Sequence, residues 1–109
     1  MSYPMNDPRL TEKDFARSVV DYAHLRHWLV YFTWYRAGVN ERRQGYQVSG
    51  FPDLVLVRPP RLVFAELKVK DNQPTATQKE WLDLLGKVAQ VESYLWRETD
   101  WSKIMEVLS

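Results

Sequence analysis

The chain has no cysteine, no long apolar run and almost no net charge, and each absence excludes a class of protein. Without cysteine there is no disulfide framework and no thiolate zinc site, which is compatible with a reducing cytoplasm. No apolar stretch approaches the roughly 20 residues that span a membrane, and residues 1–9 lack the apolar core of a signal peptide. The 15 basic and 14 acidic residues leave a formal charge of +1, unlike the strongly basic balance of a non-specific DNA coat. We therefore expect a cytoplasmic protein with no membrane partner.

The composition is that of a folded domain. Apolar residues make up 45% of the chain and aromatic residues 14%, which argues against disorder. A length of 109 residues suits one domain. We expect residues 1–109 to form a single domain in which residues 1–10 are a flexible N-terminal segment.

Caps and apolar stripes predict the helices. Thr11 and Asp14 have the spacing of a capping box, and an apolar face follows on a helix over about 12–26. Thr75 or Thr77 caps a second helix by the same reasoning. A last helix is expected to begin after residue 99 or 100.

Four strands are predicted, at residues 28–34, 54–57, 62–70 and 90–96. The second is apolar throughout, as expected for a strand covered on both faces. In the third, apolar residues and the polar series Glu66, Lys68 and Lys70 take opposite faces. The segment between the third and fourth strands is long enough for a parallel crossover. The predicted fold is therefore α/β, with a mixed sheet flanked by helices in the order α-β-β-β-α-β-α.

The most informative segment is a predicted hairpin whose turn is residues 58–61. If Val57 pairs with Leu62 across this turn, counting outward brings Asp53 opposite Glu66. Residues directly opposite in an antiparallel pair have Cβ atoms about 5 Å apart and share a face. Two carboxylates so placed repel, and one takes up a proton unless a cation lies between them.

An acid pair beside a lysine indicates a site for a hard divalent metal and a phosphate. Lys68 shares the face of Glu66. The two carboxylates and a backbone carbonyl, for which we take that of Leu67, would leave positions for water and a phosphate oxygen. Lys68 can orient or deprotonate the water, or stabilise the transition state as a point charge. The alternative is an ordinary salt bridge between Lys68 and an acid on the surface of a hairpin.

Two further polar residues lie on otherwise apolar helical stripes. Glu12 extends the stripe that begins with Phe15, so it either reaches the metal site or simply favours the positive end of the helix dipole. Gln78 precedes Trp81 on the inward stripe of its helix, where its amide can bond a water or a phosphate. Gln78 also has capping-box spacing to Thr75, so both interpretations stay open.

Basic residues near the hairpin are candidate nucleic-acid contacts. The loop over 36–50 carries Arg36, Arg42 and Arg43, and arginines make salt-dependent contacts with phosphates. Arg58 and Lys70 are further candidates. The alternative is that these are solvated loop charges.

Together these residues resemble a known signature, that of the PD-(D/E)XK nucleases, and more narrowly the small stand-alone form of the VRR-NUC branch, which phages often encode. The resemblance rests on Gly50-Phe51-Pro52-Asp53, Glu66-Leu67-Lys68, Gln78 and Trp81, with additional support from Trp96-Arg97 and Asp100-Trp101. It covers nearly the whole chain from Glu12 onward. The chain departs from similar sequences in having Phe32 where they often have histidine, and in the loop that follows.

The resemblance implies a restriction-endonuclease-like αβββαβ core and Mg²⁺- or Mn²⁺-dependent hydrolysis of phosphodiester bonds. It makes Asp53 and Glu66 metal ligands, Lys68 the catalytic lysine, Glu12 the acid of the first helix and Gln78 the glutamine of the following helix.

Stand-alone members of this branch are associated with branched DNA such as four-way junctions, which homodimers cut. We therefore expect a DNA endonuclease in a bacterial or phage-infected cell. A nucleic-acid-binding module on the same fold, with its catalysis idle, is the main alternative, and an RNA-processing nuclease is another.

Overall fold

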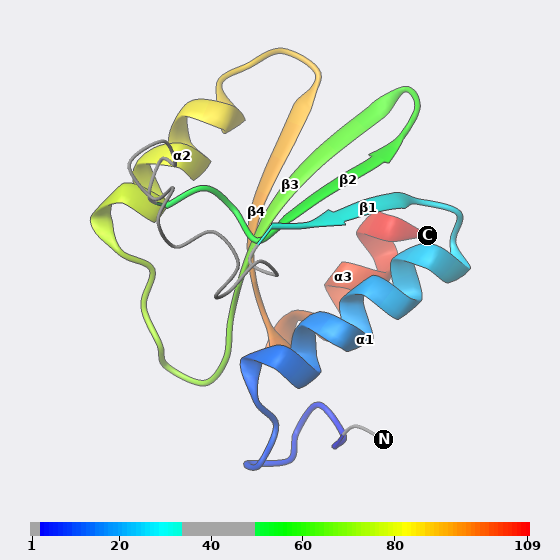
Figure 1. Ribbon diagram of the computed structural model, residues 1–109, viewed down its shortest axis with the longest axis vertical. Helices are drawn as coiled ribbons and strands as arrows, with labels where there is room; N and C mark the ends of the chain where they lie inside the picture. Colours follow the sequence, from blue (N-terminus) through cyan, green and yellow to red (C-terminus); the bar gives the residue numbers. More distant parts are fainter. Residues whose placement is uncertain (1–2, 34–49) are drawn as a thin grey trace, which may run out of the picture.

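The computed structural model describes residues 3–33 and 50–109 (Figure 1). Its elements follow in the order α1 (Glu12–Leu25), β1 (Leu29–Phe32), β2 (Leu54–Arg58), β3 (Arg61–Lys68), α2 (Ala76–Gly86), β4 (Val91–Arg97), the short 3₁₀ helix η2 (Glu98–Asp100) and α3 (Trp101–Leu108). This order confirms the predicted succession of helices and strands. No helix within these two ranges is long and apolar enough to cross a membrane.

The four strands form one mixed sheet in the order β1-β2-β3-β4. The pairs β1–β2 and β2–β3 are antiparallel, whereas β3 and β4 run parallel. A parallel neighbour requires a crossover connection, and α2 supplies it. The structure therefore confirms the predicted α/β fold with a mixed sheet.

Helices cover the sheet from both sides. In Figure 1, α1 and α3 lie together on one side and α2 lies on the other. The core forms between α1, α3 and the facing sheet surface, and includes Phe15, Val19, Leu54, Leu56, Val63, Ala65, Leu67, Trp96, Ile104 and Leu108. On the other face α2 packs against β3 and β4. Val55 and Val57 are consequently only half-buried, so the prediction that residues 54–57 are covered on both faces was wrong.

Both predicted capping boxes are present. The Thr11 hydroxyl accepts a hydrogen bond from the Asp14 amide at 3.1 Å, and the Asp14 carboxylate accepts one from the Thr11 amide. This cap makes Glu12 the first residue of α1. Thr75 and Gln78 form the equivalent pair at the start of α2.

The end of the chain is fastened to the turn between β2 and β3. The indole Nε1 of Trp28 donates to the Leu108 carbonyl at 2.9 Å, and the Arg58 guanidinium lies over the Trp28 ring. Arg58 also donates to the carbonyls of Arg26 and Ser109. Its donors therefore satisfy carbonyls at the ends of α1 and α3, which have no partner within their own helices.

Gly50 and Phe51 fix the segment that leads into β2. Gly50 has φ +88°, and a Cβ on it would lie 2.7 Å from the Thr77 carbonyl carbon and 2.9 Å from the Gln78 amide nitrogen. The Phe51 ring packs against Trp81 with ring centres 4.9 Å apart. Only glycine combines this backbone conformation with so close an approach to α2.

Replacing Gly50 by alanine should destabilise the fold. Positive φ alone costs a non-glycine residue about 1–3 kcal/mol, and the Cβ would also collide with the backbone of α2. Chemical denaturation of Gly50→Ala measures the loss. Gly86→Ala is the matched control, because Gly86 ends a helix and its nearest new contact is the Ser93 hydroxyl at 3.3 Å. Equal stability of the two variants would contradict this account.

Candidate active site

Asp53 lies where the β2–β3 ladder ends. The pair farthest from the turn is Leu54 with Ala65. The same register places Asp53 opposite Glu66, as counting from the turn predicted. The Asp53 carboxylate accepts a hydrogen bond from the Leu67 amide at 2.9 Å, in the place that a backbone carbonyl would take if the ladder continued.

Thr33 holds the backbone on either side of the Pro52–Asp53 peptide. The Thr33 amide donates to the Asp53 carbonyl and its hydroxyl donates to the Pro52 carbonyl, both at 2.8 Å. Pro52 is itself buried. The position of the Asp53 side chain is therefore set by hydrogen bonds from β1 as well as from β3.

Glu66 is the buried acid of the site. Its side chain is 2% exposed, and Oε1 has no hydrogen-bond partner among the described residues. Oε2 lies 3.7 Å from the Lys68 Nζ, an ion pair that is too long for a hydrogen bond. An ionised carboxylate buried with so few donors is costly unless a cation accompanies it.

Glu12 belongs to the same group of charges. It is half-buried at the start of α1, and its charge raises the pKa of both Asp53 and Glu66. Its position at the start of α1 thus brings its charge close enough to act on the other two carboxylates.

The acidic side chains have strongly raised pKa values. Burial raises the pKa of Asp53 to about 6, partly opposed by the Leu67 amide and assisted by the charge of Glu12. Burial raises the pKa of Glu66 to about 8, with a further contribution from the Asp53 charge and an opposing one from Lys68. Burial is thus the main cause of both shifts, and the repulsion expected from the sequence contributes to the pKa of Glu66.

The donor set fits a hard divalent cation. Carboxylate oxygens are the ligands that Mg²⁺ and Mn²⁺ prefer, and the unpartnered Glu66 Oε1 is an acceptor that a cation would satisfy. Within residues 3–33 and 50–109, however, no three carboxylate or histidine side chains are grouped closely enough to hold an ion as they stand. A third carboxylate ligand beside Asp53 and Glu66 would therefore require a side chain such as Glu12 to change rotamer or to act through water.

The remaining predicted site residues are placed differently. Gln78 is half-buried on the inward side of α2, and its Oε1 accepts from the Thr75 amide at 2.8 Å, so the capping role exists. Lys70 lies beyond β3 with φ 56°, and its Nζ donates to the Leu10 carbonyl. Arg58 is at the opposite end of β2 from Asp53, roughly 16 Å away at strand rise.

Two sequence predictions involve other positions. Arg36, Arg42 and Arg43 lie outside the described residues. Phe32 pairs with Leu54 in the β1–β2 ladder, one position from Asp53, so the departure from histidine falls at the edge of the acidic site.

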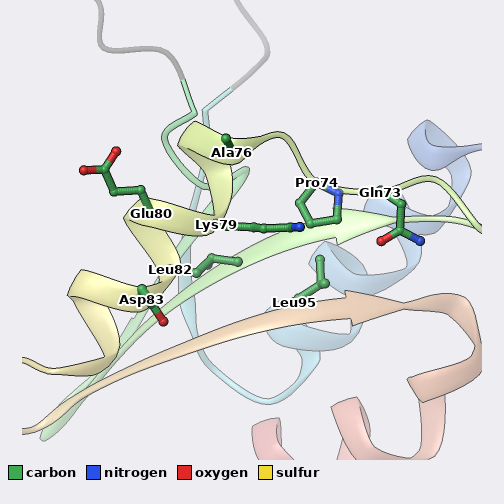
Figure 2. Close-up of a pocket in the computed structure, with 8 residues that line it drawn as sticks. All are labelled: Gln73, Pro74, Ala76, Lys79, Glu80, Leu82, Asp83 and Leu95. Atoms are coloured by element: carbon green, nitrogen blue, oxygen red, sulfur yellow. The ribbon is translucent and has the colours of Figure 1, made fainter.

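A cavity of about 580 Å³ lies between α2 and β4 (Figure 2). Figure 2 shows Leu82 and Leu95 lining the space between helix and strand, while the Glu80 carboxylate points away from them. Leu95 is the ladder neighbour of Glu66, so the cavity lies on the face of the sheet that carries Glu66. Its other lining residues are Gln73, Pro74, Ala76, Lys79 and Asp83.

The fold is that of a VRR_NUC domain. A solved structure described as "VRR_NUC domain" superimposes with a TM-score of 0.65 and 18% sequence identity, over 87% of this chain and 94% of that one. The sequence matches no protein-family model and no curated protein. The α/β architecture predicted from the sequence thus has a counterpart in a solved structure.

Stability of the metal-free protein should fall as pH rises. The folded-state pKa values of Asp53 and Glu66 lie above their ordinary values of 3.8 and 4.5, so the folded protein holds protons that the unfolded chain releases. We expect the Tm in a chelator to drop by several degrees between about pH 4 and 8, which runs from the ordinary pKa values of the two acids to the folded-state value of Glu66. Glu66→Gln, which cannot ionise, should remove most of this dependence. The same pH dependence in wild type and Glu66→Gln would count against the raised pKa of Glu66.

Proposed function

We propose that this protein is an endonuclease that hydrolyses the phosphodiester bonds of DNA with Mg²⁺ or Mn²⁺ as cofactor. The observation that carries the proposal is the buried Glu66 carboxylate, unpartnered at Oε1, next to Asp53 and Lys68. The fold shared with a VRR_NUC domain supports it.

Asp53 and Glu66 would hold the cation, together with the Leu67 carbonyl. Glu12 would bind it directly or through a water. When bound, the ion supplies Lewis acidity, since it lowers the pKa of water and offsets the negative charge that develops on phosphorus. Both carboxylates could then stay ionised at neutral pH, because their attraction to the ion would outweigh the repulsion between them.

Lys68 positions the attacking water. Its Nζ is held near Glu66 on the face where the phosphate would lie, and its side chain is 15% exposed. An ammonium there donates to the nucleophile or to the developing oxyanion. Gln78 orients substrate or water through its amide nitrogen, because the capping hydrogen bond uses only its Oε1. In-line attack leaves a 5′-phosphate and a 3′-hydroxyl.

The proposed substrate is branched DNA, such as a four-way junction. Cutting a two-fold junction on paired strands needs two sites, so the protein acts as a homodimer. In this proposal the phosphate contacts are Arg36, Arg42, Arg43 and Lys70. Arg58 is a weaker candidate, because its guanidinium already donates to carbonyls of the chain. A monomer in sedimentation that still makes paired nicks would contradict the dimer.

Removing Asp53 or Lys68 should abolish cleavage while leaving DNA binding largely intact. Asp53→Ala removes a cation ligand, and Lys68→Ala removes a charge worth roughly 10²- to 10³-fold in rate. Single-turnover cleavage and binding titrations measure the two effects. Asp21→Ala and Lys103→Ala change the same residue types at exposed helical positions and should cleave like wild type. Full activity in either site variant would refute the assignment.

A nucleic-acid-binding module with idle catalysis is the second candidate. It is favoured by the lack of three grouped carboxylate or histidine ligands in the described part of the chain. A panel of linear, flap, splayed and four-way DNA in Mg²⁺ and in Mn²⁺ separates the two, because only the nuclease nicks DNA. Competition between RNA and DNA substrates tests an RNA-processing role.

A further inference from the structure

Arg97 ends β4 directly beside Lys68, the last residue of β3. The two are partners in the parallel β3–β4 register, so their side chains leave the same face of the sheet from strands about 4.8 Å apart. Glu66 and Leu95 are the partners two positions earlier, on that same face. The sheet therefore sets a second cation next to the lysine of the proposed active site.

The backbone and guanidinium of Arg97 are held in place. Its amide donates to the Asp100 carboxylate at 2.9 Å, and its Nη1 donates to the Lys70 carbonyl at 2.9 Å. Nε and Nη2 make no hydrogen bond to any described residue. These two groups form the edge of a guanidinium that binds two oxygens of a phosphate in parallel.

The charges around Arg97 leave a role for a further cation. Glu12, Asp53 and Glu66 bring three carboxylates to the site, and Lys68 lies beside Glu66. A DNA phosphate approaching this cluster carries a negative charge of its own. One divalent ion and one lysine only balance the three acids, so a second fixed cation on the substrate side lowers the cost of bringing the phosphate in.

We propose that Arg97 binds substrate, with its Nε and Nη2 donating to the non-bridging oxygens of a DNA phosphate at or next to the bond that is cut. This inference rests on the proposed function and adds a residue to it.

A purely structural role is the competing explanation. Arg97 bonds the Lys70 carbonyl while Glu98 accepts from the Lys70 amide at 3.0 Å, so the two side chains together hold one residue at the end of β3. If holding Lys70 were the whole role of Arg97, loss of Glu98 would have similar consequences. Glu98→Ala, which removes the acceptor, is therefore the matched control.

The experiment compares wild type with Arg97→Gln, Arg97→Lys and Glu98→Ala, after their Tm values show that each is folded. Single-turnover cleavage of the best substrate from the panel gives the rate, and DNA binding over a range of salt gives the slope of log affinity against log salt. Arg97→Gln should cleave about 10- to 100-fold more slowly, with a salt slope smaller by about one. Arg97→Lys should recover the slope and part of the rate, and Glu98→Ala should match wild type in both.

Wild-type rate and slope in Arg97→Gln, or an equal loss in Glu98→Ala, would overturn the role of Arg97. These results differ from failure of the proposed function, in which wild type cuts none of the substrates. The salt slope still tests the phosphate contact in that case, because it needs only binding.

Discussion

The repulsion between two poorly solvated carboxylates is the constraint on which this structure depends. Asp53 and Glu66 face each other where a hairpin ends. Burial raises both pKa values, and the charge of Asp53 raises that of Glu66 further. A fold gains nothing in stability from such a pair, so the hydrogen bonds that hold it have to come from elsewhere. The Leu67 amide and Thr33 supply them, and the close approach of Gly50 to α2 fixes the segment that carries Asp53. In the proposed function a bound cation would offset the charge of this pair.

Two kinds of strand pairing assemble the site. The antiparallel pair β2–β3 brings the acids together, and the parallel pair β3–β4 sets Arg97 beside Lys68. The first depends on a short turn and the second on a crossover through α2. Glu12, the first residue of α1 after its Thr11 cap, adds a third acid from outside the sheet. Acidic and basic groups from four elements thus meet at one end of the sheet, where the strands stop and backbone groups are free to take side-chain partners.

Features set by local sequence could be predicted, and features set by distant partners could not. The short turn and the alternation of the strands fix the hairpin register, so the opposition of Asp53 and Glu66 followed from counting. Both helix caps followed from spacing. The spacing of Gln78 fits a cap and also an inward-facing amide, so the sequence left its role open. The structure shows that its Oε1 accepts from the Thr75 amide. The carbonyl partners of Arg58 lie at the ends of helices distant in the sequence, so no local pattern showed that its guanidinium is already engaged. The pairing of Arg97 with Lys68 depends on a parallel register that no local pattern specifies.

A crystal grown with Mn²⁺ tests the central claim most directly, since the anomalous signal of manganese locates the ion without assumptions about the chain. The account predicts one strong peak between the carboxylates of Asp53 and Glu66, at about 2.1–2.3 Å from oxygens of both, and no such peak in Asp53→Ala. Well-ordered Asp53 and Glu66 side chains with no manganese between them, at a concentration that supports binding elsewhere on the protein, would contradict it.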